Sequence, residues 1–438
     1  MIRPAEVADP DGRPSVAVVG SGLAGLAAAW LLRERARVTV YEAHERPGMG
    51  VHSVRVGANG AGPLIDVPLR VFTPAYYPTL LALYAAAGVE VAPVDYAASF
   101  SELGGDTYFR YRNARVAGRS LPWLPPGDLV RPATRAIARD LLRLHRVGPG
   151  HIADGRARGR TLGEYLAAEG YSDAFVDGFV LPTYATVCTC TLESARRYPA
   201  EVVLRYLCSG VTTQGVMRAV GGSEDVATRL LEGAASVRTS TPVAGLAPRA
   251  DGVTVTDASG SEARYDHVVL ATRADQGAAL VRGDPALTGL LERIPHEPSR
   301  VVVHHDARLA PRDRGAWRPV NILRSEHHAA PMATIWLNRV QPGLDETRPL
   351  FQTWNPLLEP APDQVVADAR VARPLVTVGT REVPASLAAL HDQADRRIWP
   401  VGSYAEAGIP LLEAAAASAF RVARVLGADV PAVADALP

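Results

Sequence analysis

The sequence contains no lysine. All 46 of its basic side chains are arginines, and 46 acidic side chains balance them, so that the formal net charge is zero. A balanced charge produces no overall attraction to nucleic acid or to an acidic membrane surface, and we expect neither partner. Because arginine stays protonated near neutral pH, none of these 46 basic side chains can act as a proton acceptor there.

Cysteine is also scarce, with three residues in 438. So few cysteines exclude a disulfide scaffold and favour a reducing compartment. Cys188 and Cys190 have no nearby Cys/His pair, so we expect buried thiols and no metal site. No secretory hydrophobic region precedes Ser15, and the longest apolar run, Val16 to Leu32, is broken by glycines and short for a membrane span. We therefore expect a soluble cytoplasmic protein without an integral membrane segment.

The strongest pattern lies near the N-terminus. The β-branched run Ser15–Val19 predicts a buried parallel strand, and a helix rich in Ala and Leu and a second strand at Arg37–Tyr41 follow it. G-x-G-x-x-G spacing between strand and helix is typical of a dinucleotide-binding turn, whose helix N-terminus faces the pyrophosphate. An acid at the end of the second strand is suited to accept hydrogen bonds from a ribose. The residues concerned are Gly20, Gly22, Gly25 and Glu42.

The same order of elements returns near the C-terminus. Arg397–Val401 predicts a strand, a glycine turn follows, and Leu411–Leu426 predicts a helix. The N-terminus of that helix is suited to stabilise a developing negative charge. Because the two copies are far apart in sequence, we expect a discontinuous nucleotide-binding domain into which other parts of the chain are inserted.

Two local patterns between these copies bear on the site. The run Ile65–Phe72 predicts a strand, in which Arg70 occupies either an exposed edge position or a position facing a ligand. Gly221 and Gly222 precede a helix for which we predict Ser223 as the cap.

Together these patterns resemble the flavin-containing amine oxidase and phytoene desaturase superfamily. The closer resemblance is to its bacterial branch of predicted NAD/FAD-binding oxidoreductases, and it covers nearly the whole chain. The segments on which it rests are GSGLAG with Glu42, ERPG at Glu45–Gly48, Asp66 with VF and Tyr77-Pro78, VGGS at Val220–Ser223, VVLATRADQ at Val268–Gln276, HHD at His304–Asp306, WLNRVQ at Trp336–Gln341 and WPVGSY at Trp399–Tyr404. The chain departs from the branch at Gly48–Gly50, at Pro68-Leu69 and in the C-terminal turn, which predicts a remodelled flavin pocket.

The resemblance implies FAD as the cofactor. It implies that the N-terminal fingerprint holds the ADP half, that the backbone of Val243 meets the adenine, and that the C-terminal turn and the Leu412 N–H lie beside the ribityl chain and the ring. The predicted cofactor-binding residues are Gly20, Gly22, Ala24, Gly25, Glu42, Ala43, Arg46, Gly48, Gly50, Val243, Thr272, Gly402, Ser403 and Leu412.

Arg70 and Tyr404 are the predicted catalytic residues, because the resemblance implies that both lie at the flavin ring. Arg70 would pair with a substrate carboxylate or carbonyl. Tyr404 would donate a hydrogen bond or form an aromatic wall.

The expected fold class is α/β. A discontinuous Rossmann-like FAD-binding domain would consist of residues 1–75, 215–290 and 391–438. The inserted α+β substrate domain, of mixed sheet and helices, would consist of a mainly helical lobe at 76–214 and a sheet at 291–390.

The leading hypothesis is an FAD-dependent oxidoreductase that abstracts a hydride, as a desaturase or dehydrogenase, from a hydrophobic acyl or secondary-metabolite substrate, free or linked to a carrier. Amine oxidation, double-bond isomerisation without net redox change, and a flavoprotein without catalysis are the alternatives. Many amine oxidases of the superfamily place a lysine beside the flavin, so the absence of lysine argues against amine oxidation.

Overall fold

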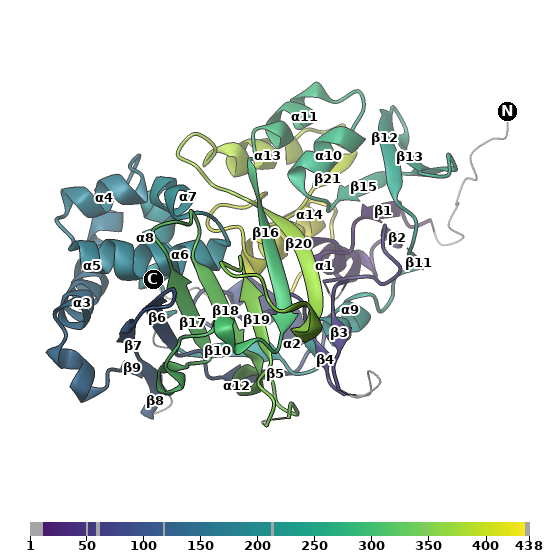
Figure 1. The fold of residues 1–438 in the computed structure, drawn as a ribbon. Helices are drawn as coiled ribbons and strands as arrows, with labels where there is room; N and C mark the ends of the chain where they lie inside the picture. The colour runs from purple at the N-terminus through teal and green to yellow at the C-terminus, as the bar shows by residue number, and fades with distance from the viewer. Residues whose placement is uncertain are drawn as a thin grey trace.

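The computed structural model describes residues 12–49, 51–57, 62–116, 119–211, 214–345 and 347–433. A five-stranded sheet in the order β11-β2-β1-β15-β21 forms one part of it, and all neighbouring strands are parallel (Figure 1). Its strands are β1 Ser15–Val19, β2 Arg37–Tyr41, β11 Ser236–Arg238, β15 His267–Leu270 and β21 Ile398–Pro400. They come from distant parts of the chain, so the discontinuous Rossmann-like domain predicted from the sequence is confirmed.

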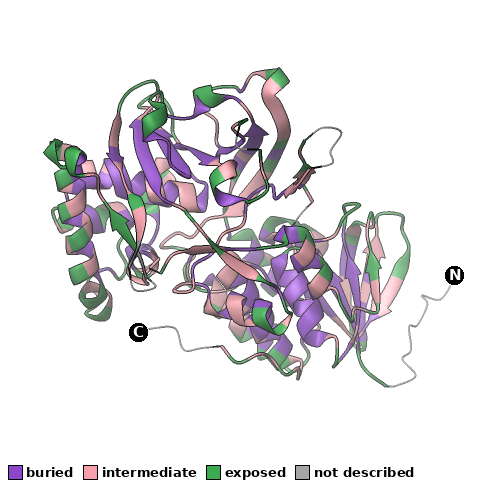
Figure 2. Cartoon of the chain, turned by 90° about the horizontal axis from the view of Figure 1, so that it is seen from below, coloured by how far each residue is buried: buried purple, intermediate pink, exposed green. Residues whose placement is uncertain are grey.

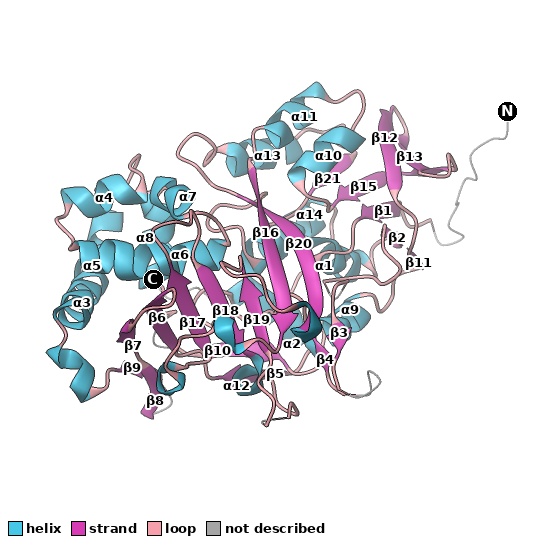
Figure 3. Ribbon diagram, viewed as in Figure 1, coloured by secondary structure: helices cyan, strands magenta, loops and turns pink. Residues whose placement is uncertain are grey.

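Both faces of the parallel sheet are covered, which explains why β1 is buried along its whole length (Figure 3). One face packs on helices that share one hydrophobic cluster: α1 Leu23–Leu32, α2 Pro78–Ala86, α9 Gly222–Leu230 and α14 Leu412–Val425. The other face packs on an antiparallel sheet, β12 Val243–Arg249, β13 Gly252–Asp257 and β14 Glu262–Tyr265, and on helices α10 Ala274–Leu280, α11 Pro285–Glu292 and α13 Val383–His391.

A seven-stranded mixed sheet forms the second part, in the order β20-β16-β19-β18-β17-β6-β7, and only β17 and β6 run parallel. Its strands are β6 Ala98–Glu102, β7 Thr107–Arg110, β16 His296–His304, β17 Val320–Arg324, β18 Met332–Trp336, β19 Phe351–Trp354 and β20 Val365–Pro374. With the helices beside it, this sheet confirms the expected α+β domain.

A group of helices packs on the β17-β6-β7 side of the mixed sheet through Phe100, Phe109 and Ile322. These helices are α3 Pro132–Ala153, α4 Leu162–Ala168, α5 Asp173–Phe175, the π-helical turn η3 Val176–Val180, α6 Leu181–Cys188, α7 Leu192–Arg197 and α8 Ala200–Cys208. Figure 2 shows their outer surfaces exposed and their inner surfaces buried. None of the helices in the described part of the chain is long and apolar enough to cross a membrane.

Short elements complete the fold. Three two-stranded pairs are β3 Val54–Arg55 with β4 Leu64–Ile65, β5 Val91–Val94 with β10 Val216–Ala219, and β8 Arg112–Val116 with β9 Arg119–Trp123. The remaining short helices are η2 Pro126–Val130, η4 Ala307–Leu309, η5 Arg314–Ala316, α12 Leu337–Val340 and η6 Pro362–Gln364. The segment 76–214 therefore contains strands as well as helices, and the domain boundaries stay a prediction.

The predicted strand over Ile65–Phe72 is wrong. Strand β4 ends at Ile65, and a cis peptide bond precedes Pro68. The side chain of Gln352 takes over the backbone pairing: its amide accepts from the Leu69 N–H at 2.7 Å and donates to the Asp66 carbonyl at 2.9 Å. Arg70 therefore follows an irregular segment and is not at a strand edge.

The predicted cap at Ser223 is also wrong. Gly221 occupies the N-cap of α9 and has no side chain that can accept a hydrogen bond. The buried carboxylate of Asp66 takes that role from outside the helix, because it accepts the Ser223 N–H at 2.9 Å.

Candidate functional site

The glycine turn after β1 is closed so tightly that two of its positions require glycine. Gly20 has a φ of +97°, and its N–H donates to the Tyr41 carbonyl at 2.8 Å. A Cβ at Gly25 would lie 2.0 Å from the Gly20 carbonyl oxygen, and a Cβ at Gly20 would lie 3.0 Å from the Ala271 carbonyl oxygen. The tight turn and the close helix packing expected from the spacing are therefore present.

Gly22 is in a different environment. It is the N-cap of α1 with a φ of −63°, and a Cβ there would meet nothing within 4 Å. No side chain of the described residues caps this helix. Its first turn, which includes the buried Ala24, contains no acid. The free N–H groups and partial positive charge of a helix N-terminus favour an anion, and the open space at Gly22 would leave room for a pyrophosphate.

Glu42 ties the end of β2 to this turn. Its buried carboxylate accepts the Ser21 N–H at 3.1 Å, the Ser21 hydroxyl, and the His44 N–H at 3.0 Å. The Ser21 hydroxyl oxygen in turn accepts the Gly48 N–H at 2.7 Å. Gly48 has a φ of +90°, and a Cβ there would lie 2.5 Å from the Cβ of Ala227, so this position also requires glycine. Sequence reasoning missed Ser21, although it lies between two of the fingerprint glycines.

The structure brings four further predicted residues near this turn. Val243 begins β12 two residues after Thr241, whose N–H donates to the Glu42 carbonyl at 2.8 Å. The backbone nitrogen of Thr272 lies 3.5 Å from a Cβ built at Gly20. Ala43 and Arg46 are exposed in the segment after Glu42. Gly50 lies outside the described residues.

The C-terminal turn follows the end of β21. The Gly402 N–H donates to the Ser418 hydroxyl at 3.0 Å, and a Cβ at Gly402 would lie 2.6 Å from the Tyr404 ring. Ser403 is half-buried beside it. Leu412 begins α14, whose N-terminus has no side-chain cap. Ser418 lies inside that helix, where no sequence pattern marked it.

Tyr404 is 6% exposed and belongs to the hydrophobic cluster that contains Val19, Leu270 and Ile398. Its hydroxyl is buried and has no hydrogen-bond partner among the described residues, and burial raises its pKa. No contact with a substrate follows from this placement, so the catalytic role of Tyr404 stays a prediction.

Arg70 is half-buried, and its charge interacts with Asp66 of the same segment, with Tyr84 of α2 and with Arg373 of β20. Burial, and next the positive charge of Arg373, lower the pKa of Arg70 to about 10, while Asp66 and Tyr84 raise it. Its Nε is buried and has no hydrogen-bond partner in the part of the chain that the structure describes. A pKa near 10 leaves the guanidinium charged at neutral pH, so Arg70 is a half-buried cation.

Eight tyrosines of the segment 76–206 are connected by ring or electrostatic contacts, Tyr84 through the ring of Phe72. Tyr76 and Tyr206 have ring centroids 4.9 Å apart, and Tyr184 and Tyr198 have centroids 5.0 Å apart. Burial raises the pKa of all eight hydroxyls, so each stays a hydrogen-bond donor at neutral pH. The eight residues, called the tyrosine cluster below, are Tyr76, Tyr77, Tyr84, Tyr96, Tyr111, Tyr184, Tyr198 and Tyr206.

Four members of the tyrosine cluster are half-buried: Tyr76, Tyr96, Tyr111 and Tyr206. Sequence reasoning missed the cluster because its members are spread over residues 76–206 and share no local spacing.

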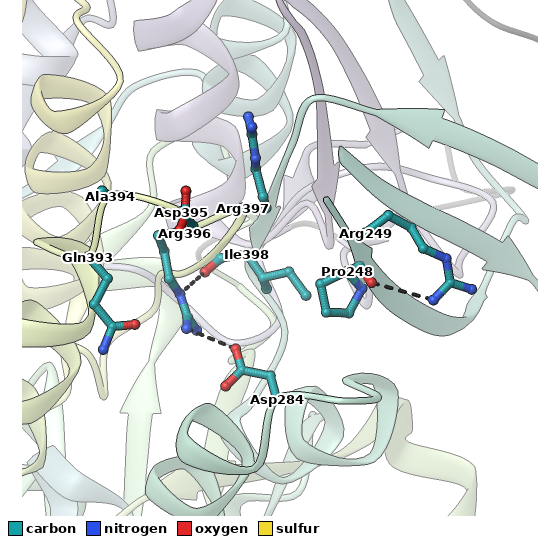
Figure 4. Close-up of a pocket in the computed structure, with 9 residues that line it drawn as sticks. All are labelled: Pro248, Arg249, Asp284, Gln393, Ala394, Asp395, Arg396, Arg397 and Ile398. Carbon is teal, nitrogen blue, oxygen red and sulfur yellow. Dashed lines mark hydrogen bonds and ion pairs between the residues drawn. The ribbon is translucent and has the colours of Figure 1, made fainter. Parts of the chain in front are cut away.

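The surface pocket drawn in Figure 4 lies elsewhere. It has a volume of about 350 Å³, and an Arg396–Asp284 ion pair of 2.8 Å crosses it. Its lining residue Ile398 is the first residue of β21, so the pocket lies at the amino end of that strand. Both glycine turns lie at carboxyl ends, where doubly wound sheets bind ligands, so this pocket is separate from the candidate site.

Cys188 and Cys190 are buried, and burial raises the pKa of the Cys188 thiol to about 11 and also raises that of Cys190. Within the described ranges, no group of three or more His, Cys, Asp or Glu side chains could hold a metal ion.

Comparisons with known proteins agree with this architecture. A family profile described as NAD(P)-binding Rossmann-like domain matches residues 18–87. Among curated proteins none matches.

Solved structures match over most of their length. Putrescine oxidase bound to putrescine is 14% identical, with 94% of this chain and 98% of that chain covered and a TM-score of 0.65. The CLA-producing fatty acid isomerase from P. acnes has the same identity, coverage and TM-score. Cyclohexylamine oxidase from Brevibacterium oxydans IH-35A is 15% identical, with 94% and 98% covered and a TM-score of 0.60. At 14–15% identity, these structures show that the chain shares their fold.

Proposed function

We propose that this protein is an FAD-dependent oxidoreductase that abstracts a hydride from a hydrophobic substrate, as a desaturase or dehydrogenase does. The observation that supports FAD binding most directly is the uncapped N-terminus of α1 at Gly22, with open space at the Cα and the buried Glu42 carboxylate next to it. Room for a pyrophosphate, N–H donors for it and an acceptor for a ribose are the requirements of a dinucleotide.

The chain would divide the cofactor between its two glycine turns. The N–H groups at the start of α1 would bind the pyrophosphate, and Glu42 would accept from the ribose. Gly402 and the N-terminus of α14 would lie beside the ring, where a helix N-terminus favours negative charge. Bound FAD would supply hydride acceptance, while the protein orients the reacting C–H and excludes water.

Two observations favour carbon substrates over amines. The resemblance implies that Arg70 lies at the flavin ring, where its positive charge would repel an ammonium group. The chain also contains no lysine to assist reoxidation of the flavin by oxygen. Double-bond isomerisation without net redox change is the second candidate, because a fatty acid isomerase shares the fold.

An absorption spectrum of the purified protein tests the proposal. We expect a flavin spectrum, and acid precipitation releases a yellow supernatant that contains FAD, because no Cys or His lies in the C-terminal turn to form a covalent link. A colourless protein that fails to take up added FAD would contradict the proposal.

Anaerobic mixing with candidate fatty acids separates the two reaction types. A desaturase bleaches the flavin in proportion to the product formed, whereas an isomerase forms product without lasting bleaching. We expect no turnover of putrescine or cyclohexylamine, and rapid hydrogen peroxide production with either amine would refute the choice of a carbon substrate.

A further inference from the structure

Exposed apolar side chains are concentrated at one end of the molecule. Figure 1 shows β9 and α3 at this end, and η2 connects them. The described residues include nine large hydrophobic side chains that are exposed, and five of the nine lie between positions 121 and 142. Such a concentration on one surface is typical of a binding face, whereas single exposed residues are not. The five are Leu121, Trp123, Leu129, Val130 and Leu142.

Four of the five belong to one short segment, residues 121–130, with the sequence LPWLPPGDLV. Leu121 and Trp123 are two positions apart on β9, so their side chains point to the same side of the strand. Leu129 and Val130 end η2, and Val130 is 73% exposed. This apolar segment therefore presents a surface that the rest of the described chain leaves exposed.

The one acid of the apolar segment is removed from the surface. Asp128 is 5% exposed, and its carboxylate accepts from the Arg110 Nε at 2.7 Å and from the Arg110 Nη2 at 3.3 Å. The exposed side chains of residues 121–130 are therefore all uncharged.

A stripe of arginines adjoins the apolar segment. The Arg135 side chain donates to the carbonyl oxygens of Leu129 and Val130, at 3.2 Å and 3.1 Å. Exposed residues recur on both sides of Arg135 every three or four positions, which places them on one face of α3. The exposed face consists of Arg131, Arg135, Arg139, Leu142 and Arg146. Its four arginines are called the arginine stripe below.

The arginine stripe provides positive charge that the protein does not neutralise by ion pairing. Arg139 pairs with Asp140 at 2.9 Å, but no acid of the described residues forms an ion pair with the other three arginines. Asp140 is the only acid of α3 and is 1% exposed. The zero net charge of the whole chain therefore hides a local positive surface next to an uncharged apolar one.

We propose that this end of the molecule binds the surface of a membrane that contains anionic lipid. Leucine, valine and tryptophan flanked by arginines have the composition of a protein surface that lies in the interface of a bilayer. The apolar side chains would enter the headgroup region, and the arginines would pair with lipid phosphates. A second copy of the chain fits this face poorly, because a two-fold contact would bring the two arginine stripes together. The inference goes beyond the proposed function and does not depend on it.

Sedimentation of the full-length protein with vesicles tests the inference. Vesicles of phosphatidylcholine with phosphatidylglycerol supply the anionic lipid, and vesicles of phosphatidylcholine alone are the neutral control. We expect tighter binding to the anionic vesicles than to the neutral ones. Binding should weaken when sodium chloride is raised to about 0.5 M, because salt screens the attraction between arginines and lipid phosphates.

Two double variants separate the contributions of charge and apolar surface. Arg135→Gln with Arg146→Gln should weaken binding about thirtyfold, since each basic side chain near an anionic surface contributes about a factor of five. Val130→Ser with Leu142→Ser should weaken binding at least about tenfold, because it removes apolar surface that the bilayer would bury. Val130 and Leu142 are 73% and 72% exposed, so this variant should keep a urea midpoint close to that of wild type.

Matched control variants remove the same kinds of side chain elsewhere. Arg249→Gln with Arg381→Gln changes two exposed arginines, in β12 and just before α13, which both lie away from α3 in Figure 1. Val425→Ser changes an exposed apolar side chain at the end of α14. Both controls should bind the anionic vesicles within about twofold of wild type.

Tryptophan fluorescence identifies a side chain that enters the bilayer. Trp123 is 46% exposed, whereas the other five tryptophans are buried or half-buried. Anionic vesicles with brominated acyl chains should therefore quench part of the fluorescence of the wild type, and this quenching should be absent in Trp123→Phe.

Four results would overturn the inference. They are no binding of the anionic vesicles, equal binding by wild type and both double variants of this face, equal quenching in wild type and Trp123→Phe, and a wild-type dimer that Val130→Ser with Leu142→Ser converts to monomers in sedimentation equilibrium. The last result would show that the face joins two copies of the chain and does not bind lipid.

Discussion

Replacing each of two fingerprint glycines by alanine should separate cofactor binding from folding. At Gly25 the new Cβ would lie 2.0 Å from the Gly20 carbonyl oxygen, so strand β1 and helix α1 would have to move apart by about 1 Å. Forcing a methyl group into a packed interior costs about 1–3 kcal/mol, and we expect the upper end because the opposing atom is backbone.

At Gly22 the same methyl group meets nothing within 4 Å, and the φ of −63° suits alanine. Alanine is a poorer N-cap than glycine, so the free energy of unfolding should fall by only about 0.5–1 kcal/mol. The methyl group would nevertheless occupy the space that the pyrophosphate needs, so FAD affinity should fall about tenfold to a hundredfold.

The assay compares urea unfolding of the apoproteins with fluorescence titration of FAD. Apoprotein is needed because bound FAD would itself stabilise the native state. Gly289→Ala is the matched control: Gly289 is exposed inside α11 with nothing near its Cβ, so alanine should stabilise the protein by about 0.5–1 kcal/mol and leave FAD binding unchanged. A Gly22→Ala protein that binds FAD as tightly as wild type would refute the placement of the pyrophosphate at α1.

Two further predictions concern Glu42 and His304. Glu42→Arg should lower FAD affinity at least about tenfold, because it replaces the ribose acceptor by a cation, and unchanged affinity in the same titration would show that Glu42 does not meet the ribose. Burial lowers the pKa of His304 from 6.5 to about 4. The unfolded chain therefore binds a proton at a higher pH than the folded chain does, so the free energy of unfolding decreases as the pH falls from 6.5 to about 4. The contribution of His304 to this decrease should reach about 3 kcal/mol and be absent in His304→Gln. Urea midpoints with the same pH dependence in wild type and His304→Gln would contradict this prediction.

The nucleotide fingerprint is readable from the sequence because its geometry is local. The turn at Gly20 and the packing at Gly25 depend on the space around backbone atoms of adjacent elements, and this space excludes any Cβ. The strands predicted at Ser15–Val19, Arg37–Tyr41 and Arg397–Val401 and the discontinuous domain follow from the same kind of local pattern.

The segment around Arg70 shows where local patterns stop being sufficient. Its apolar run predicts a strand, yet Gln352 from β19 satisfies the backbone of Leu69 and Asp66. Gln352 lies 283 residues after Leu69 in the sequence. Propensity cannot anticipate such a partner, because it depends only on neighbours along the chain.

The sequence alone thus determined the Rossmann-like fold, the glycine turns and the acid at the end of β2. Only the tertiary structure decided that Gln352 pairs with the backbone before Arg70, that Asp66 accepts the Ser223 N–H of α9, and that Ser418 accepts the Gly402 N–H. The physical reason is that a fingerprint turn is set by the sterics of consecutive residues, whereas contacts between distant segments are set by the packing of sheets and helices.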